Sequence, residues 1–236
     1  MIKEEFIKYC KDLGILINED LYSKLYRYYE LLVEWNSKFN MTTILEEKDV
    51  FLLHFYDSLC LIKAIDLNKK QTLCDFGTGA GFPGLVLGLV FGDLEITLVE
   101  SNTKKCQFLN YVCNELSISN VYVVNSRIEE YASKNREKFD IITCRAVTSI
   151  PIILELSISS LKVDGLLVPL KSNCIEEVNK YSYLENELGV KLIKFIEYKL
   201  PINDAYRSIP MYMKNKITDL KYPRNYGTIV KKYKEK

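Results

Sequence analysis

The chain has 236 residues, of which 48% are hydrophobic, and a formal net charge of +1, so it can fold around a sizeable core. It has no run of the ~18 to 20 apolar residues that a membrane span needs. Its seven cysteines form no C-x-x-C pair and its only histidine is His54, which argues against a metal site or a disulfide framework. The opening MIKEEFIK carries acids and lacks an apolar signal segment, so we expect a cytoplasmic protein.

The first part of the chain has a helical pattern. Apolar side chains recur at helical spacing in residues 2–13 and again in residues 21–35, and Asn18 stands where the N-cap of the second helix is expected. A third helix is predicted at about 48–65. We therefore expect residues 1–68 to form a helical extension packed on the domain that follows.

The only histidine lies in the third predicted helix. Asp57 and Ser58 follow His54 at spacings of three and four, so the three side chains share one helix face and can form a hydrogen-bonded cluster. A single histidine in an apolar helix is usually a packing residue. From the spacing alone, a structural role and a catalytic role for His54 both remain open.

From residue 69 onward, short apolar strands alternate with helices, which is typical of a mostly parallel sheet with helices on both faces. Seven strands are predicted within an α/β domain at 69–214. The last strand is expected at an edge, because Pro210 lacks the N–H that a central strand donates. The predicted strands are Thr72–Phe76, Glu95–Glu100, Val121–Asn125, Phe139–Cys144, Gly165–Leu170, Lys191–Leu200 and Ser208–Lys214.

Residues 72–84, TLCDFGTGAGFPG, indicate a buried strand, a glycine-rich turn and the start of a helix. Gly77, Gly79 and Gly81 allow positive φ angles and a close approach of the backbone to a ligand. The turn also satisfies the dinucleotide pattern G-x-G-x-x-G, so a dinucleotide and S-adenosylmethionine both remain open. Asp75 favours S-adenosylmethionine, because a carboxylate repels a pyrophosphate but attracts a sulfonium or an ammonium group.

Further residues at strand ends fit an adenosine. Glu100 ends the second predicted strand, 19 residues after Gly81, which is the distance at which an acid accepts hydrogen bonds from ribose hydroxyls. Ile128 and Glu129 follow the third strand and are expected along the adenine. A backbone amide and the Glu129 carboxylate would then be available to the adenine nitrogens.

Two cations follow later strands. Arg145 comes directly after the fourth predicted strand, and Lys171 follows the fifth. A buried guanidinium is costly and would repel a cationic cofactor, so Arg145 is expected to bind an anionic, phosphate-bearing substrate rather than to support packing. Lys171 adds a second cation to the same rim.

The end of the chain is basic. From Lys214 onward, eight Lys or Arg residues face only two acids, Asp219 and Glu235. Residues 215–236 are therefore expected to form a basic C-terminal tail, whose YPRNYGT segment is too rich in turn formers for a helix. A solvated tail and a contact with nucleic acid phosphates are both possible from charge alone.

These motifs resemble those of the glucose-inhibited-division B family (GidB/RsmG). The resemblance covers nearly the whole chain, and the turn DFGTGAGFPG beside HFYDSL is its most specific part. The matching segments are WNSKFNMTT at 35–43, HFYDSL at 54–59, DFGTGAGFPG at 75–84, SRIEEY at 126–131, CRAV at 144–147 and KYPRNYGT at 221–228.

The resemblance implies a class I, Rossmann-like methyltransferase that uses S-adenosylmethionine to methylate N7 of a guanine in the 530 loop of 16S ribosomal RNA. The expected partner is this RNA or the small ribosomal subunit, with no metal and no membrane. A nicotinamide-dependent oxidoreductase and a non-catalytic RNA-binding module stay open as alternatives.

The resemblance also implies roles for individual residues. Gly77 and Phe82 would be cofactor contacts, in addition to the residues already named for the cofactor site. Arg145 corresponds to the family's arginine and is counted with both the cofactor contacts and the catalytic residues. Lys171 and His54 complete the set that is expected to be catalytic.

Overall fold

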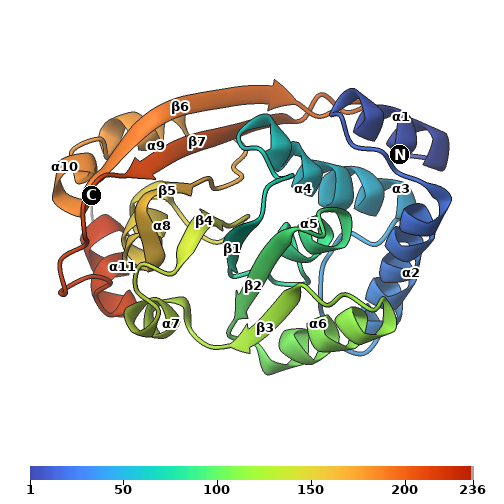
Figure 1. Ribbon diagram of the computed structural model, residues 1–236, viewed down its shortest axis with the longest axis horizontal. Helices are drawn as coiled ribbons and strands as arrows, with labels where there is room; N and C mark the ends of the chain where they lie inside the picture. The colour runs from blue at the N-terminus through green and yellow to red at the C-terminus, as the bar shows by residue number, and fades with distance from the viewer. Residues whose placement is uncertain (235–236) are drawn as a thin grey trace.

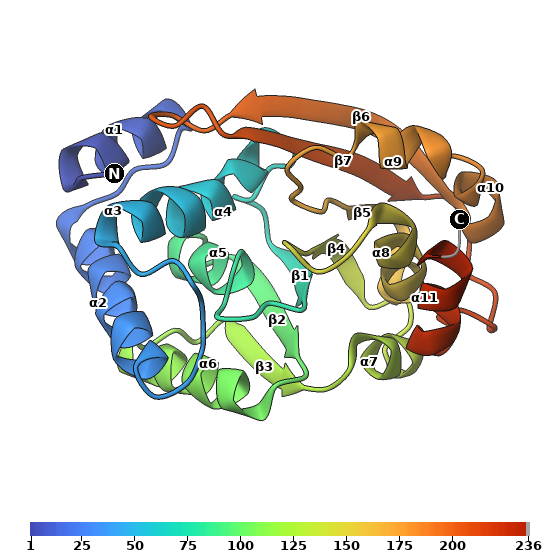
Figure 2. The same ribbon diagram turned by 180° about the vertical axis from the view of Figure 1, so that it is seen from behind.

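The computed structural model describes residues 1–234, which form one seven-stranded sheet with helices on both faces (Figures 1 and 2). Each strand overlaps the range predicted for it, so the mostly parallel, seven-stranded α/β sheet is confirmed. The strands are β1 Gln71–Phe76, β2 Leu94–Glu100, β3 Val121–Asn125, β4 Phe139–Thr143, β5 Leu161–Leu167, β6 Val190–Lys199 and β7 Tyr206–Lys214.

The strand order is β3-β2-β1-β4-β5-β7-β6. Strands β1 to β5 pair in parallel, whereas β7 runs antiparallel to both β5 and β6. The chain moves outward from β1 through β2 to β3 and then returns to place β4 on the other side of β1. In parallel sheets, ligands bind at the carboxyl ends of the strands where the order reverses in this way.

The helices divide into two groups that bury the two faces of the sheet. Helices α1, α2, α5 and α6 and the segment 47–63 pack in one core cluster, and α7 to α11 pack in the other. The helices are α1 Lys3–Asp12, α2 Glu19–Asn36, α3 Glu47–Asp49, α4 Asp57–Leu59, α5 Gly84–Val90, α6 Thr103–Glu115, α7 Ile128–Lys134, α8 Ile150–Ser157, α9 Ile175–Lys180, α10 Leu184–Leu188 and α11 Tyr226–Lys234; η1 Val50–Tyr56 is a π-helix, and η2 Cys60–Lys63 and η3 Ile158–Ser160 are 3₁₀ helices.

The N-terminal region is helical, as predicted. Asn18 caps α2, because its side chain accepts a hydrogen bond of 2.8 Å from Leu21 N. The third predicted helix is a continuous run, 47–63, whose central part is the π-helix η1. π-Helical segments are rare and often occur at functional sites, and this one contains His54. The division of the chain at residues 68 and 214 stays a prediction.

The prediction that Pro210 makes its strand an edge is wrong. Strand β7 lies between β5 and β6. Ser208 exchanges both backbone hydrogen bonds with Lys171 on the β5 side, so the Pro210 nitrogen, two residues later, faces the same side. There β5 pairs only with Tyr212 and Met213, so the missing N–H of Pro210 falls in a gap of the ladder.

The C-terminal segment is more helical and more buried than its sequence indicates. The YPRNYGT segment was predicted not to be helical, but helix α11 begins at Tyr226 within it. Lys214 is fully buried; its Nζ donates to the carbonyls of Ile158 and Leu161 at 2.9 and 2.7 Å and pairs with Glu137. Arg224 Nε likewise donates to the buried Glu155 carboxylate at 2.6 Å, so two of the eight basic residues hold buried contacts. Residues 235–236, counted in the basic tail, lie outside the described residues.

Candidate functional site

The glycine-rich turn between β1 and α5 is organised by one buried carboxylate. Asp75, in β1, has no exposed surface, and its Oδ2 accepts hydrogen bonds from Thr78 Oγ1 at 2.7 Å and from Gly84 N at 2.8 Å. Gly77 and Gly79 have φ angles of 67° and 61°, in the left-handed region that residues with a Cβ rarely adopt. The Asp75 carboxylate and the two glycines thus fix the shape of the turn.

The other oxygen of Asp75, Oδ1, has no hydrogen-bond partner within the described part of the chain. Burial raises the pKa of Asp75 to about 6, although the hydrogen bonds from Thr78 and Gly84 and the charge of Arg145 act to lower it. The carboxylate lies beneath the turn and does not line the cavity above it. A direct contact between Asp75 and a cofactor therefore stays a prediction.

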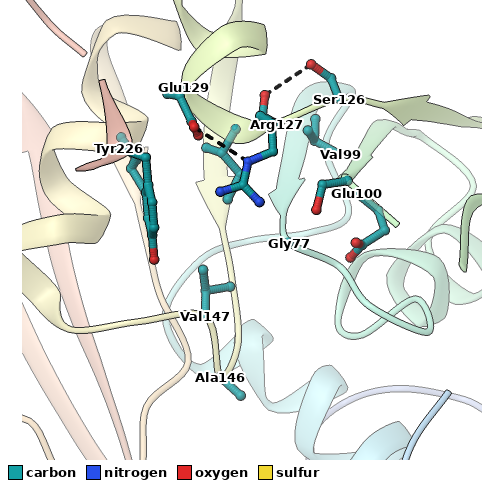
Figure 3. Close-up of a pocket in the computed structure, with 12 residues that line it drawn as sticks. Gly77, Val99, Glu100, Ser126, Arg127, Glu129, Ala146, Val147 and Tyr226 are labelled. Atoms are coloured by element: carbon teal, nitrogen blue, oxygen red, sulfur yellow. Dashed lines mark hydrogen bonds and ion pairs between the residues drawn. The ribbon is translucent and has the colours of Figure 1, made fainter. Parts of the chain in front are cut away.

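A cavity of about 200 Å³ lies at the carboxyl ends of β1, β2 and β3; we call it the nucleoside cavity (Figure 3). Four residues predicted to bind the cofactor line it: Gly77, Glu100, Ile128 and Glu129. The complete lining is Gly77, Val99, Glu100, Ser101, Ser126, Arg127, Ile128, Glu129, Ala146, Val147, Leu156 and Tyr226.

Glu100 connects the glycine turn to the end of β2. Its Oε2 accepts a hydrogen bond of 3.0 Å from Gly79 N, and its Oε1 accepts one of 2.7 Å from Asn102 N. Each carboxylate oxygen can accept a further hydrogen bond, so both remain available to hydroxyl groups in the cavity. Glu100 can therefore position the turn and bind a ligand at the same time.

Gly79, Gly81 and Phe82, also predicted as cofactor contacts, do not line the nucleoside cavity. Gly81 has a φ of 105°, and a Cβ there would collide with the Tyr28 hydroxyl, so packing against α2 requires this glycine. The Phe82 ring is buried, with ring centroids 5.7 Å from Tyr28 and 4.3 Å from His54. Phe82 therefore supports the turn from below.

A second cavity, of about 370 Å³, shares the lining residue Ala146 with the first; we call it the cationic cavity. Ala146 follows β4 with a φ of 56°, an unusual value for a residue with a Cβ. The residues predicted to be catalytic, His54, Arg145 and Lys171, all line the cationic cavity. Its lining is Ile44, Leu53, His54, Asp57, Arg145, Ala146, Leu170, Lys171, Ser172 and Arg207.

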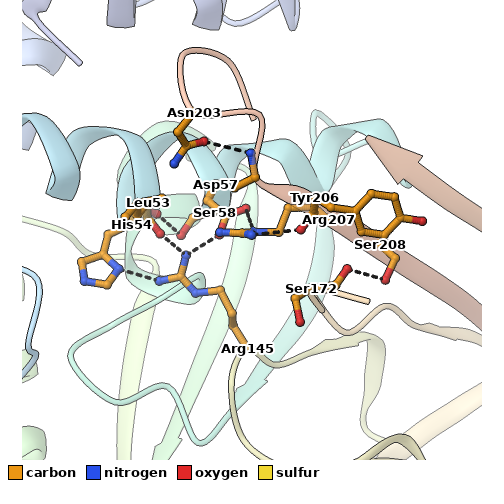
Figure 4. Close-up of polar contacts among 11 residues, drawn as sticks. Leu53, His54, Asp57, Ser58, Arg145, Ser172, Asn203, Tyr206, Arg207 and Ser208 are labelled. Atoms are coloured by element: carbon orange, nitrogen blue, oxygen red, sulfur yellow. Dashed lines mark hydrogen bonds and ion pairs between the residues drawn. The ribbon is translucent and has the colours of Figure 1, made fainter. Parts of the chain in front are cut away.

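Arg145 joins the end of β4 to the π-helix η1 (Figure 4). Its Nη1 donates to Leu53 O at 2.8 Å and to Asp57 Oδ2 at 3.2 Å, and its Nη2 lies 2.9 Å from His54 Nδ1. The guanidinium carbon lies 5.4 Å from the centre of the Phe82 ring. The sequence predicts an anionic substrate as its partner; in the structure, the partners are groups of the protein. Its role toward a substrate stays a prediction.

Asp57 also pairs with a second arginine. Arg207 Nε lies 3.1 Å from both carboxylate oxygens of Asp57. Lys171, on the same wall, has its Nζ 3.9 Å from Glu177. Even with Glu177 counted, three cations, Arg145, Arg207 and Lys171, stand against two carboxylates. The cationic cavity thus carries excess positive charge, which suits an anionic ligand.

His54 is held as a neutral hydrogen-bond donor. A guanidinium can only donate, so His54 Nδ1 accepts from Arg145, and the ring proton lies on Nε2, which is 3.0 Å from Thr42 Oγ1. Burial, and then the charge of Arg145, lower the pKa of His54 to about 3. The predicted cluster of three bonded side chains is found only in part: Arg145 connects His54 and Asp57, whereas Ser58 Oγ donates to the backbone carbonyl of His54 at 2.5 Å.

Within residues 1–234, no three His, Cys, Asp or Glu side chains are grouped so that they could hold a metal ion. The seven cysteines are buried and free. Over the same residues, no helix has both the length and the apolar character to span a membrane.

Comparison with known proteins identifies the family. The GidB family model, described as rRNA small subunit methyltransferase G, matches residues 21–199. The ribosomal RNA small subunit methyltransferase G of Fusobacterium nucleatum is 39% identical over 231 residues, which are 98% of this chain and 99% of the relative. The chain belongs to the GidB family. The family predicted from the motifs is therefore confirmed, and with it a methyltransferase that uses S-adenosylmethionine.

Solved structures outside the GidB family share its fold. Precorrin-6y C5,15-methyltransferase from Geobacter metallireducens has a TM-score of 0.52 and 13% identity, with 76% of this chain and 95% of that chain covered. TYW2 from M. jannaschii, solved in complex with AdoMet, has a TM-score of 0.52 and 14% identity, with 62% and 70% covered. At these identities the likeness concerns the fold alone, and it confirms the class I, Rossmann-like fold.

Arg207 and Tyr226 are among the lining residues that were not singled out from the sequence. Arg207 lies at the start of β7, and a cation near the end of an antiparallel strand gives no signal until its partner Asp57 is known. Tyr226 stands in the KYPRNYGT segment, which was assigned to the tail and to the family resemblance but not to the cofactor site. Both residues lie beyond the segment that the GidB family model matches.

Proposed function

We propose that this GidB-family protein transfers the methyl group of S-adenosylmethionine to N7 of a guanine in the 530 loop of 16S ribosomal RNA, on the free RNA or on the small ribosomal subunit in the cytoplasm. The observation that carries the proposal is that two cavities of different character share the lining residue Ala146. One is lined by groups that suit an adenosine, and the other has an excess of cations.

The nucleoside cavity fits the cofactor. Gly77, Glu100, Ile128 and Glu129 would hold its adenosine part, with the Glu100 carboxylate as acceptor for the ribose hydroxyls. The unpartnered Oδ1 of Asp75 fits a cationic cofactor better than a pyrophosphate, since a buried carboxylate oxygen without a partner favours positive charge nearby. When bound, S-adenosylmethionine supplies a methyl group on a sulfonium centre.

The cationic cavity fits the substrate. The side chains of Arg207 and Lys171 are 19% and 17% exposed, so both can reach a phosphate at the mouth of the cavity. Arg145 would act from below by holding the wall that Leu53, His54 and Asp57 form.

No general base is needed at this site, because guanine N7 carries no proton. The neutral His54, whose pKa is lowered to about 3, agrees with such a reaction, since it would be a poor base at neutral pH. Its role would be to keep the wall of the cavity in place. Positioning of the base and exclusion of water would then supply the rate acceleration.

Calorimetric titration of the purified protein with S-adenosylmethionine and with NAD tests the cofactor half of the proposal. We expect S-adenosylmethionine to bind and NAD not to bind. In a separate assay, we expect the protein to transfer a labelled methyl group from S-adenosylmethionine to small ribosomal subunits. Binding of NAD alone would support the oxidoreductase, and binding of RNA without either cofactor would support a non-catalytic module.

A further inference from the structure

The C-terminal helix contributes a wall to the nucleoside cavity. Tyr226, the first residue of α11, lines the cavity together with Arg127, Ile128 and Glu129 from the start of α7. The Arg127 guanidinium carbon lies 5.3 Å from the centre of the Tyr226 ring, and its Nε lies 3.5 Å from Glu129. In Figure 3, Tyr226 and Glu100 stand on opposite sides of the cavity.

A buried ionic cluster fixes α11 in this place. Glu155 of α8 has no exposed surface and accepts hydrogen bonds from Arg224 Nε at 2.6 Å and from the Tyr233 hydroxyl at 3.1 Å. These two partners lie just before and near the end of α11, so both ends of the helix are tied to α8. A buried carboxylate with several charge-assisted bonds orders the segment that supplies them.

The chain that leads to α11 is also tied down. Arg136, at the end of the loop after α7, donates to the backbone carbonyl of Tyr222 at 2.7 Å and to that of Thr218 at 2.5 Å. The same loop and helix α7 therefore support both Arg127 and the approach to Tyr226. These contacts therefore hold the Tyr226 ring in its position beside the cavity.

We propose that Tyr226, together with Arg127, whose guanidinium lies over its ring, forms the wall that binds the adenine ring of S-adenosylmethionine, so that the basic tail is part of the cofactor site. The inference rests on the proposed function, because it assigns a further residue to the same site. An aromatic ring and a guanidinium both present flat faces, which are the surfaces that bind a planar heterocycle. Glu100 lies on the opposite side of the cavity, where it would accept hydrogen bonds from the ribose hydroxyls. The adenine would then lie on the side of Tyr226.

Two substitutions at one position test this contact. Tyr226→Phe keeps the aromatic face, whereas Tyr226→Leu keeps apolar bulk but removes that face, so neither should unfold α11. Tyr122→Leu, at an exposed tyrosine of β3, is the control. Affinity is measured by calorimetry with S-adenosylmethionine and with methylthioadenosine, which has the adenosine but lacks the amino acid part. Thermal unfolding of each variant shows that it is folded.

We expect Tyr226→Leu to weaken both ligands by the same factor, at least about fivefold, since stacking of a base on an aromatic side chain typically contributes that much or more. Tyr226→Phe and Tyr122→Leu should bind like the wild type. Unchanged affinity in Tyr226→Leu, or a loss confined to S-adenosylmethionine, would overturn the inference and leave the proposed function standing. Failure of the wild type to bind S-adenosylmethionine would overturn both.

Discussion

Arg145 Nη2 lies 2.9 Å from Nδ1 of His54, the only histidine in the chain. Because a guanidinium has no acceptor, this contact fixes the tautomer of His54 with its proton on Nε2. The contact also joins β4 to η1, two segments separated by 91 positions in the sequence. A wall of the cationic cavity is therefore shaped by a contact between a residue after a strand end and a π-helix.

His54 should remain neutral across the physiological range. Burial and Arg145 lower its pKa to about 3, so the imidazole should show no titration between about pH 5 and pH 8. Nitrogen-15 NMR of the imidazole can follow this directly, since one histidine gives one set of ring signals. We expect the Nε2–H tautomer throughout; a titration near pH 6.5 would contradict the Arg145 contact.

Arg145→Ala should fold and bind S-adenosylmethionine, because Arg145 does not line the nucleoside cavity. Loss of its bonds to Leu53, Asp57 and His54 should reduce stability by about 1.5 to 3 kcal/mol. Methyl transfer to ribosomal RNA should fall by about a hundredfold, since small displacements of a positioned group have effects of that size.

The matched control for this variant is Arg27→Ala, which removes an arginine from an exposed ion pair on α2. It should leave methyl transfer unchanged. If Arg145→Ala transfers the methyl group at the wild-type rate, Arg145 has a purely structural role.

Asp75 should make stability depend on pH. Burial raises its pKa to about 6 from 3.8, so the folded state holds this proton more tightly than the unfolded state. The contribution of protonated Asp75 to the free energy of unfolding is therefore fully present below about pH 4 and is lost as the pH rises through about 6. In Asp75→Asn without cofactor, the free energy of unfolding relative to the wild type should rise by about 3 kcal/mol over this interval.

Urea unfolding across this pH range measures the effect, and Asp204→Asn, at an exposed aspartate, serves as the control. If the difference between Asp75→Asn and the wild type does not change with pH, Asp75 is not protonated on folding in the way that its burial implies.

Lys214 should support the fold and not the RNA contact. Lys214→Met removes the partner of Glu137 and of two buried carbonyls, so the free energy of unfolding should fall by about 3 kcal/mol. The slope of log affinity for small ribosomal subunits against log salt should not change. Lys171→Gln, by contrast, should lower that slope by about 1. The reverse pattern in a salt series would contradict both the structural role of Lys214 and the RNA-facing role of Lys171.

The elements that were predicted correctly are those whose pattern lies within a short stretch of sequence. The strands of the sheet have short apolar runs, and the turn with Gly77 and Gly79 has its own backbone requirement, so both were found before the structure. Glu100 was found because a fixed spacing relates it to the turn. The place of β7 was missed, because one proline can be tolerated where the neighbouring strand has a gap.

The contacts between distant segments could not be predicted from such signals. The ion-pair partner of Arg145 is Asp57, the first residue of α4, and Asp57 is shared with Arg207, 150 positions away along the chain. Likewise, Tyr226 was predicted to lie in a basic tail and a family motif but not at the cofactor site, since nothing local indicates that α11 returns to the nucleoside cavity. A count of charged residues along the sequence does not show whether a basic side chain is buried, as Lys214 is, or available to bind RNA.

The position of the methyl group on the RNA tests the central claim most directly. Small ribosomal subunits that lack the modification are incubated with the protein and labelled S-adenosylmethionine, and the RNA is then cleaved by a reaction that breaks the chain at N7-methylated guanines. Cleavage at a single guanine of the 530 loop, strongly reduced with Arg145→Ala, is the result that we predict. Labelled RNA without cleavage in that loop, or no transfer by a wild-type protein that binds S-adenosylmethionine, would contradict the proposed function.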